Sequence, residues 1–379
     1  MYSQNVSILF TFLYIIVHFV SSVPPDTLRQ VNVLFRHGDR SPMMSFPTDE
    51  HQEDSWPQGF GWLTNIGKLQ HYHLGKFLRQ HYSGFLNTTY DHRQIKVESS
   101  CIPRCLMSAY SNLAGLYPPV GQQVWETNLL WQPIPVETKP GNEDNILYMG
   151  KPCPRYDQLF EKEMRSHEVT DEEKKNKAFY DFIDKKTGIT RENISSIWSV
   201  ADTLICERHH NMSAPSWLNE TVFKKLRELQ SFSFYIKFGT PELARLKGGP
   251  LLKRMLVNFQ NKIKGTDKTK FFMFSAHDTT VCALLSAMKV FNKRSPPYAA
   301  TILTELHEKA NGSFFIRIYY KNTTQDVNDY MTPPTQLIVP GCDADCPFDK
   351  FVQLLQETIP VNWKRRMPCI SKENCTFLT

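Results

Sequence analysis

The sequence lacks the features that define several large classes of protein. Its formal net charge of +6 is spread along 379 residues and forms no basic run, so it gives little support to nucleic-acid binding, which depends on clustered Lys and Arg. It has no group of Cys and His with the spacing of a structural zinc site, and no obvious set of carboxylates that would hold another metal ion. We expect no nucleic-acid partner and no cofactor.

The chain also lacks an apolar run long enough to cross a bilayer, which requires about 20 residues. The run Ile8–Val20 has 13 residues and precedes the small residues Ser21 and Ser22. This pattern predicts a signal peptide over residues 1–22, although Met1–Ser7 contains no Lys or Arg. No later run reaches spanning length. We therefore expect the mature protein to be soluble, secreted and without a membrane anchor; the lysosomal lumen is the alternative.

Nine cysteines in an exported chain predict disulfides, and the odd number leaves at least one thiol outside an intrachain pair. Cys342 and Cys346 are close enough in sequence to close a tight loop. Export is also supported by the density of Asn-X-Ser/Thr triplets, each a candidate glycosylation site. Seven such triplets lie in the mature region, at Asn87, Asn193, Asn211, Asn219, Asn311, Asn322 and Asn374.

The most informative motif is Leu-Phe-Arg-His-Gly-Asp-Arg-Ser-Pro at residues 34–42. The apolar residues at its start predict a buried strand that the Gly-Asp-Arg-Ser-Pro part cannot continue, which places His37 at a strand end. Open α/β sheets bind ligands beyond the carboxyl ends of their strands. An imidazole between the guanidiniums of Arg36 and Arg40 suits a doubly charged anion such as a phosphoryl group. A surface loop of salt bridges is the alternative.

A second predicted strand end repeats this arrangement. The apolar segment Phe271–Phe274 predicts a buried strand, and it leads into Ser-Ala-His-Asp-Thr-Thr before helical spacing begins at Val281. A His-Asp pair alone is more typical of a polar turn. The placement of His277 and Asp278 nevertheless matches that of His37, which indicates that the two motifs contribute to one site.

Arg104 is a candidate third arm of this anion site. It follows a short predicted strand at Ile95–Val97 and precedes a helical pattern that Pro118 stops. A phosphate group near a helix N-terminus gains from free backbone N–H groups and from the helix dipole. Pairing of Arg104 with a nearby acidic residue explains its presence equally well.

Two further helices are expected beside the sheet. Apolar residues at helical spacing over residues 66–82 predict the first. Its histidines, His71, His73 and His81, include no pair three or four residues apart, so we interpret them as part of a solvated face rather than as metal ligands. The second helix is expected over residues 252–263.

Between residues 161 and 239, charge-rich helical stretches replace the alternation of strands and helices. Thr170 and Glu173 form a capping box that predicts a helix start, and this helix is expected to end near Gly188. Apolar spacing from Val222 predicts another helix. A mostly helical insertion is the simplest explanation, and its charged runs are interpreted as solvated faces.

The two strand-end motifs supply the groups that phosphoryl transfer requires. His37 is the candidate nucleophile, because neutral imidazole attacks phosphorus and nearby arginines disfavour its protonation. Asp278 is the candidate proton donor to the leaving alcohol and the later activator of water. Cations lower the pKa of Asp278, whereas burial and the phosphate dianion raise it, so we expect an acidic optimum. Arginines neutralise the charge, and the reaction then needs no metal ion.

The chain resembles the histidine acid phosphatases, in the second branch of the histidine phosphatase superfamily. Segments 36–42 and 275–280 look like the paired signatures of that family. The likeness extends to segments 56–61, 130–136 and 337–342 and covers nearly the whole mature chain. Within the family it is most similar to lysosomal, prostatic-type and insect venom acid phosphatases. The resemblance implies a secreted, metal-independent acid phosphatase for small phosphomonoesters, and relatives are often homodimers.

The resemblance implies an α/β fold, a three-layer sandwich with a mixed central sheet between helices, plus a smaller, mostly helical domain. We place the core at residues 23–135 and 240–379 and the inserted helical domain at 136–239. The resemblance assigns His37 as the nucleophile that becomes phosphorylated and Asp278 as the proton donor. The implied phosphate-binding residues are Arg36, Arg40, Arg104 and His277.

The resemblance also implies disulfides, between Cys342 and Cys346 and between Cys153 and Cys369. Cys206 lacks its family partner. The pairing of the remaining cysteines stays open at this stage.

The chain departs from the family pattern around the third arginine. Residues 98–105 read Glu-Ser-Ser-Cys-Ile-Pro-Arg-Cys, so Arg104 is kept, whereas a leading arginine and two aspartates are missing. A disulfide between Cys101 and Cys105 would hold this turn instead. Two other functions stay open: a phytase-like phosphatase on the same scaffold, and a non-catalytic glycoprotein that binds anions.

Overall fold

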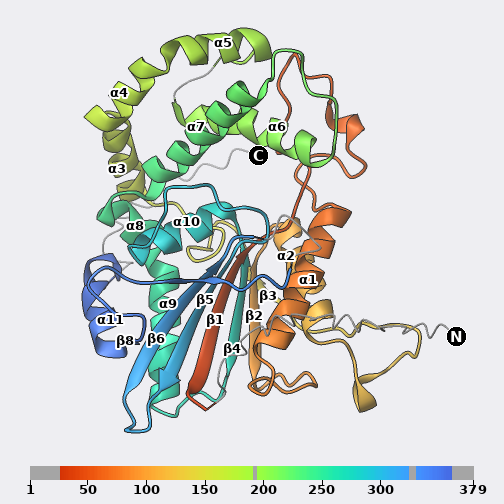
Figure 1. Cartoon of the computed structure of the whole chain (residues 1–379), viewed down its shortest axis with the longest axis vertical. Coiled ribbons are helices and arrows are strands. Elements are labelled where there is room, and N and C mark those ends of the chain that lie inside the picture. The colour runs from red at the N-terminus through yellow and green to blue at the C-terminus, as the bar shows by residue number, and fades with distance from the viewer. Residues whose placement is uncertain (1–25, 191–193, 324–329, 361–379) are drawn as a thin grey trace, which may run out of the picture.

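A computed structural model describes residues 26–190, 194–323 and 330–360. One sheet forms its centre (Figure 1), and the strand order across it is β3-β2-β4-β1-β5-β6-β7, with β8 paired to β6. The strands are β1 Leu28–Arg36, β2 Ile95–Ser100, β3 Glu137–Lys139, β4 Phe271–Ala276, β5 Thr301–Glu308, β6 Phe314–Lys321, β7 Thr335–Leu337 and β8 Cys346–Pro347.

The sheet is mixed, as expected. Strand β4 pairs in parallel with both β1 and β2, and β2 pairs in parallel with β3. Strands β5, β6 and β7 continue the sheet with antiparallel pairs. Parallel neighbours need crossover connections, and helices supply them here.

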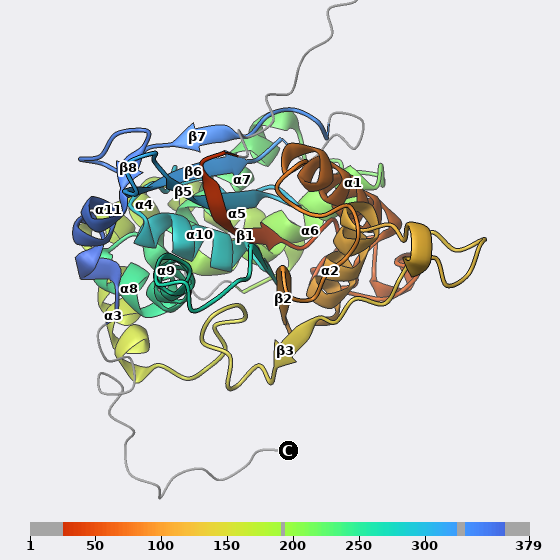
Figure 2. The same cartoon turned by 90° about the horizontal axis from the view of Figure 1, so that it is seen from below.

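Helices cover both faces of the sheet and confirm the expected three layers (Figures 1 and 2). Side chains alternate between the faces along β1: Val33 and Phe35 pack in the apolar cluster under α1 and α2, whereas Leu34 packs in the cluster under α9, α10 and α11. These helices, with the short α8, are α1 Asn65–His81, α2 Pro103–Leu116, α8 Pro241–Lys247, α9 Gly249–Ile263, α10 Asp278–Ala287 and α11 Phe348–Leu354.

Five more helices, α3 to α7, lie above the carboxyl end of β1 (Figure 1). They share an apolar cluster of their own that includes Tyr180, Leu204 and Leu226. Residues 137–139 form β3 of the central sheet, so the first part of the expected 136–239 insertion pairs with the core. The five helices are α3 Pro154–Met164, α4 His167–Lys175, α5 Lys177–Thr187, α6 Ile197–His209 and α7 Glu220–Phe238.

The predicted capping box at Thr170 is wrong. Helix α4 begins after Ser166, whose side chain accepts a hydrogen bond from the Val169 N–H. Thr170 lies inside the helix, and its hydroxyl donates to the Ser166 carbonyl. A serine one turn earlier satisfies the free N–H groups, so Thr170 is not needed there. The single helix predicted from here to Gly188 is two helices, α4 and α5, which meet at Asn176. The position of the end is confirmed, because Gly188 closes α5 in the left-handed conformation.

The predicted solvated face of α1 is also wrong for two of its three histidines. His71 and His81 are buried, with 0% and 6% of their surface exposed. His71 Nε2 lies 3.0 Å from the carbonyl oxygen of Arg36 at the end of β1, and donates to it. Burial lowers the pKa of His71 to about 3, so the ring is neutral. It replaces the water that a strand-end carbonyl would otherwise need.

The predicted disulfide between Cys342 and Cys346 is present. The suggested Cys101–Cys105 bond is not, because both are free thiols. Cys105 points into the protein, where its thiol donates to the Ala276 carbonyl at 3.2 Å, and this contact replaces a bond to Cys101.

Several predictions from the sequence concern residues outside the described part of the chain. Cys206 and Cys282 are free and buried. The expected Cys153–Cys369 pair is not tested, since Cys369 is not described. The predicted signal peptide, the sequons at Asn193 and Asn374, and Cys375 lie outside the described residues as well.

Candidate active site

The strand register brings the two sequence motifs together. Strands β1 and β4 are parallel neighbours in which Arg36 pairs with Ala276. The next residue of each strand, His37 and His277, therefore leaves the sheet at the same edge. The His37 N–H donates to the Ala276 carbonyl at 2.9 Å, and the two imidazole rings lie 5.7 Å apart with their planes nearly perpendicular.

His37 has one ring nitrogen free for chemistry. Its side chain is buried, and Nδ1 lies 2.8 Å from the carbonyl oxygen of Gly38. A carbonyl only accepts, so Nδ1 carries the proton and Nε2 keeps its lone pair. Burial lowers the pKa of His37 well below its usual value, and the charges of Arg104, Arg36 and Arg40 lower it further. The ring is thus neutral, as predicted, although burial outweighs the arginines.

The loop that carries His37 lies directly against the start of α1. A Cβ atom on Gly38 would lie 2.3 Å from the Gly67 carbonyl oxygen, and one on Gly67 would lie 2.1 Å from the Asp39 carbonyl oxygen. Only glycine permits this approach. The Thr64 side chain caps α1 by accepting from the Gly67 N–H, and the Thr64 N–H donates to the Asp39 carbonyl. The loop is fixed by backbone contacts.

Arg36 connects His37 to the second motif. Its Nη2 lies 3.0 Å from an oxygen of Asp278, and its Nη1 donates to the Pro296 carbonyl at 2.6 Å. The guanidinium also lies over the ring of Tyr298, 4.2 Å from the ring centre. Tyr298 has no counterpart in the sequence motifs, and nothing in its local pattern marked it.

Asp278 begins helix α10, directly after the capping residue His277. Burial raises the pKa of Asp278, but Arg36 and Arg40 lower it more, and the net pKa is below its usual value. In the ligand-free protein Asp278 is therefore an ionised carboxylate. To act as a proton donor it must gain a proton when substrate binds.

Arg40 is buried, and most of its guanidinium is already bonded. Its Nη1 and Nη2 donate to the two carboxylate oxygens of Asp202 at 2.9 Å and 2.8 Å. Asp202 comes from α6, far away in sequence. The predicted phosphate-binding arginine thus has a carboxylate partner that local sequence reasoning missed.

Arg104 has the least compensated charge of the three arginines. It stands in the first turn of α2, as predicted, and its Nη1 approaches the Gly61 carbonyl at 3.4 Å. No carboxylate lies within salt-bridge distance of it among the residues that the structure describes. The suggested alternative, an arginine paired with a nearby acid, does not hold there. Of the surrounding charges, Arg104 has the largest effect on the pKa of His37.

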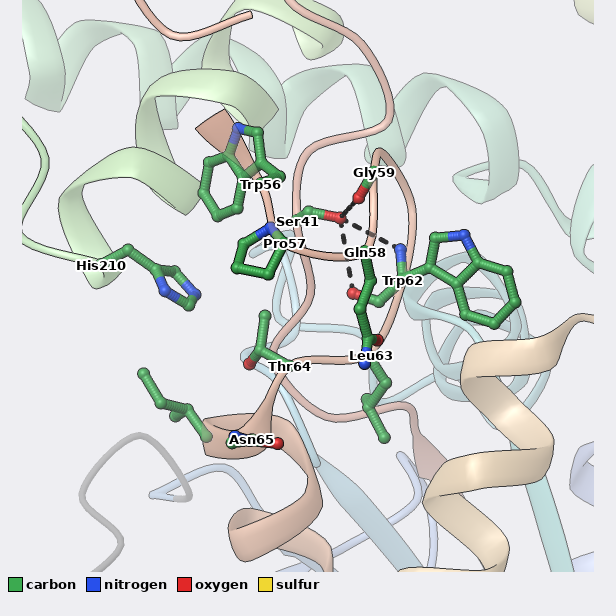
Figure 3. A pocket seen from close by; sticks show the side chains of 11 residues that line it. Ser41, Trp56, Pro57, Gln58, Gly59, Trp62, Leu63, Thr64, Asn65 and His210 are labelled. Carbon is green, nitrogen blue, oxygen red and sulfur yellow. Dashed lines mark hydrogen bonds between the residues drawn. The ribbon is translucent and has the colours of Figure 1, made fainter. Parts of the chain in front are cut away.

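Ser41 holds residues 59–62, the segment that contacts Arg104 through Gly61. Figure 3 shows the Ser41 hydroxyl bonded to Gly59 and Trp62, with distances of 2.7 Å to the Gly59 carbonyl oxygen and 3.1 Å from the Trp62 N–H. Beside this segment lies a cavity of about 280 Å³, where Trp56 and His210 face each other.

His277 is neutral and already has hydrogen-bond partners. Its Nε2 lies 2.9 Å from the Ser100 hydroxyl, and the Cys105 sulfur lies 3.6 Å from the same nitrogen. Burial lowers the pKa of His277 to about 3, with a further contribution from Arg104. Both Ser100 and Cys105 belong to the turn that departs from the family pattern, so that turn still contacts the site.

Asp39 is a further buried group that the sequence motifs contained without an assigned role. Its carboxylate accepts a hydrogen bond from Thr64 at 2.5 Å and lies 2.7 Å from His210 Nε2 and 3.4 Å from His209 Nδ1. Burial alone raises the pKa of Asp39, but bonds to His209, His210 and Thr64 lower it to about 2. His209 is the last residue of α6 and His210 follows it directly. This helix therefore contacts the loop at Asp39 as well as at Arg40.

Within the described residues, no group of three or more His, Cys, Asp or Glu side chains is placed to hold a metal ion. In the same part of the chain, no helix has the length and apolar character of a membrane span.

A sequence profile of the histidine phosphatase superfamily, branch 2, matches residues 27–321. The chain belongs to this family. Lysosomal acid phosphatase of Bos taurus is 42% identical over 341 residues, which cover 89% of this chain and 79% of the relative. Prostatic acid phosphatase of Homo sapiens is 42% identical over 347 residues, which cover 90% of this chain and 88% of the relative. This branch 2 histidine phosphatase is thus an enzyme of the acid phosphatase type, which confirms the predicted family.

Solved structures show the same fold for this histidine phosphatase. The Hafnia alvei phytase in complex with tartrate aligns with a TM-score of 0.70 at 16% identity and covers 90% of this chain and 99% of its own. The phytase from Citrobacter braakii aligns with a TM-score of 0.66 at 17% identity and covers 89% and 99%. Identities this low establish the shared architecture alone.

Proposed function

We propose that this protein is an exported acid phosphatase that hydrolyses small phosphomonoesters through a covalent phosphohistidine on His37, without a metal ion. One observation carries the proposal: the free Nε2 of a neutral, buried His37 is surrounded by three arginines, and Asp278 lies across the site. A nucleophile, a cationic cradle and a carboxyl group are the parts that this reaction needs.

Substrate binding uses the charge that the ligand-free site leaves open. Arg104, which has no carboxylate partner in the described residues, attracts the anionic phosphoryl group first. Arg36 can exchange Asp278 for a phosphoryl oxygen, since both are anionic acceptors at one guanidinium. Arg40 and His277 complete the cradle. The positive charge comes from side chains, and the chemistry therefore requires no Lewis acid.

Binding also prepares Asp278 for its role. When Arg36 engages the phosphoryl group, Asp278 loses its closest cation and gains an anionic neighbour, and both changes raise its pKa. A phosphate monoester has a second pKa of about 6, so below that pH the substrate arrives as a monoanion with a proton to give. Transfer of this proton to Asp278 yields the acid that catalysis requires. An acidic optimum follows.

The reaction then proceeds in two balanced steps. Nε2 of His37 attacks phosphorus, the bond from phosphorus to the leaving oxygen breaks, and Asp278 gives its proton to that oxygen. The resulting Asp278 carboxylate accepts a proton from a water molecule that attacks the phosphohistidine. The N–P bond breaks, and inorganic phosphate leaves with His37 restored.

Export is proposed from the leading apolar run and from the sequons. Of the seven, those that the structure describes stand on exposed asparagines: Asn87, Asn211, Asn219, Asn311 and Asn322. The Cys342–Cys346 disulfide suits an oxidising compartment. Digestion of the protein from a eukaryotic secretion host with an N-glycosidase, followed by mass spectrometry, tests site occupancy. A homodimer stays a prediction that sedimentation would check.

The catalytic proposal is tested by turnover of p-nitrophenyl phosphate from acidic to neutral pH, with and without a chelator, for the parent and for His37→Ala. We expect activity that is highest in acid, indifferent to the chelator and abolished in the variant. Alkaline denaturing quench during turnover of ³²P-labelled substrate should trap label on the parent only, and this label should be stable in base and lost in acid. Loss of activity on addition of the chelator contradicts the metal-free mechanism. An inactive parent contradicts the proposal that this protein is a phosphatase. A parallel assay with inositol hexakisphosphate tests the phytase-like alternative.

A further inference from the structure

One buried ion pair joins the loop at residues 37–42, called the catalytic loop below, to helices α3 to α7, called the upper helices. Arg40, 2% exposed, follows the nucleophile by three residues, and Asp202, 4% exposed, belongs to α6. Their contact is bidentate, with the distances of 2.9 Å and 2.8 Å given above. Burial of both partners makes this contact far less screened by solvent than a surface salt bridge.

The contact with Asp202 occupies the Nη1 and Nη2 end of the Arg40 guanidinium and leaves the Nε and Nη2 edge available to a ligand. Nη1 donates to Asp202 and to the Ser41 carbonyl at 3.0 Å, which uses both of its hydrogens. Nη2 gives one hydrogen to Asp202. The Nε of Arg40 is buried and has no hydrogen-bond partner in the described residues. An arginine has five N–H donors in one plane, so the edge formed by Nε and Nη2 keeps two parallel donors.

This open edge has the geometry that a phosphoryl group accepts. Two parallel N–H donors bind two oxygens of a phosphate, as in bidentate arginine–phosphate contacts. Arg40 follows His37 by three residues, and its guanidinium is close enough to His37 and His277 to lower the pKa of both, so Arg40 belongs to the site where phosphorus would lie. A buried Nε without a partner is costly in a ligand-free protein, and a bound phosphate would satisfy it.

Asp202 also fixes the chain that follows Arg40. One of its oxygens accepts the Met43 N–H at 3.2 Å, so the carboxylate holds both the guanidinium and the backbone three residues later. An arginine side chain has about 2 kcal/mol of rotamer entropy to lose on immobilisation. In this protein the loss occurs on folding, before any ligand binds.

We propose that Asp202 is a positioning residue for phosphate: by holding one edge of the Arg40 guanidinium, it presents the Nε and Nη2 edge to the phosphoryl group of the substrate. The inference rests on the proposed function and adds to it a residue from the helical insertion. Asp202 does not touch substrate and acts through Arg40. A different role, as a mere neutraliser of positive charge, makes the opposite prediction, because removal of a negative charge would then tighten anion binding.

Calorimetric titration of the whole protein with inorganic phosphate tests the inference without requiring turnover. We expect Asp202→Asn to raise the phosphate dissociation constant about ten- to a hundredfold. Without the Asp202 carboxylate, Arg40 is no longer held in place, and its charge-assisted bidentate contact with phosphate is lost. Asp202→Glu restores the carboxylate at a longer reach and should recover part of the affinity. Unchanged or tighter binding by a folded Asp202→Asn protein overturns the proposal.

A double-mutant cycle separates positioning from general damage to the fold. In an Arg40→Ala background, Asp202→Asn should have almost no further effect on phosphate affinity, because its only route to the ligand is gone. Additive losses would show that Asp202 acts by another route, and would overturn the proposal. If Asp202→Asn alone does not fold, the same cycle with Asp202→Glu shows whether Asp202 affects phosphate affinity through Arg40.

Glu207→Gln is the matched control: it replaces another buried carboxyl group of α6 by an amide, and Glu207 has no contact with Arg40 among the hydrogen bonds and ion pairs of the described residues. It should leave phosphate affinity unchanged in acid. Turnover of p-nitrophenyl phosphate is measured on the same samples. Tight phosphate binding by a parent that does not hydrolyse ester contradicts the proposed function while the binding cycle still decides the role of Asp202.

Discussion

At the scale of single residues, the site separates three arginines that look equivalent in sequence. Arg36 is paired with Asp278 and Arg40 with Asp202, whereas Arg104 has no acidic partner among the described residues. Arg104, which lies in the turn that departs from the family pattern, is therefore the arginine whose charge is least neutralised by nearby carboxylates. Its position also makes it the strongest cationic influence on the pKa of His37, so in the proposed mechanism it affects the protonation of the nucleophile as well as substrate binding.

Replacement of Arg104 by alanine should therefore change both affinity and pH dependence. Loss of one charge-assisted contact should raise KM about ten- to a hundredfold. Since Arg104 lowers the pKa of His37, its removal raises that pKa, a larger fraction of the nucleophile is protonated in acid, and the acid limb of kcat/KM moves to higher pH. Arg104→Lys keeps the charge and should restore the limb more than the affinity. An acid limb that does not move in Arg104→Ala would refute this influence.

At the scale of elements, the catalytic loop depends on a close contact with α1. Two glycines, Gly38 and Gly67, allow the backbones to meet, and the cap at Thr64 holds them in register. Strand β1 and strand β4 then deliver His37 and His277 to one edge. The order of the elements could be predicted from local patterns, because alternation and helical spacing are local. The glycine contact could not, since Gly67 lies within an ordinary helical pattern.

Gly67→Ala should disturb catalysis, although alanine favours a helix by about 1 kcal/mol over glycine. The added Cβ would lie 2.1 Å from the Asp39 carbonyl oxygen, so the loop must move, at a cost of about 1–3 kcal/mol in unfolding free energy. We expect a lower Tm together with a lower kcat.

Gly75→Ala is the matched control for Gly67→Ala. It lies in the same helix, and its Cβ would lie 2.0 Å from the Asn112 carbonyl oxygen of α2, far from the loop. It should lower Tm by a similar amount while the folded protein keeps its kcat. Equal losses of kcat in the two variants would show that the loop contact has no special role.

At the scale of the whole molecule, the core and the upper helices are joined through buried polar groups. Besides the contacts of α6 with Asp39 and Arg40, a pair of carboxyl groups lies between the segment after the catalytic loop and α6. Glu207 of α6 is 2% exposed and lies close enough to Asp49 for Asp49 to raise its pKa. No N–H or O–H donor among the described residues reaches either oxygen of Glu207 or the Oδ2 of Asp49. We therefore expect Glu207 to keep its proton and to donate it to Asp49.

This pair predicts a protein that is more stable in acid. Burial, and then the hydrogen bond and charge of Asp49, raise the pKa of Glu207 to about 9. A carboxyl whose pKa is raised on folding stabilises the native state fully below its unfolded pKa, and this stabilisation declines as pH rises toward the folded value. Between about pH 5 and about pH 7 the loss should reach up to about 2 kcal/mol.

Thermal unfolding as a function of pH measures this effect. The parent should lose Tm between acidic and neutral pH, and Glu207→Gln should lose much less, because an amide donates to Asp49 without a titratable proton. The neighbouring His51, whose N–H donates to Asp49 Oδ1, is kept in both proteins. Equal pH dependence in parent and variant would exclude the pair as the cause.

Local patterns in the sequence were enough to predict strands β1, β2 and β4, the helices that became α1, α2, α7, α9 and α10, the two strand-end histidines, an anionic ligand and the family. Each depends on local periodicity or on residues adjacent in the chain, which a linear reading contains. It went wrong where a contact came from elsewhere: His71 is buried because the end of β1 needs a donor, and Cys105 stays free because the Ala276 carbonyl accepts its thiol hydrogen.

The folded structure was needed to show which arginines already have carboxylate partners, that Asp278 is ionised in the ligand-free protein, and that α6 places Asp202 and two histidines against the catalytic loop. These properties depend on burial and on distances between residues more than a hundred positions apart in the chain. Electrostatic energies in a protein interior vary with position and solvent access, and neither quantity is present in the order of the amino acids.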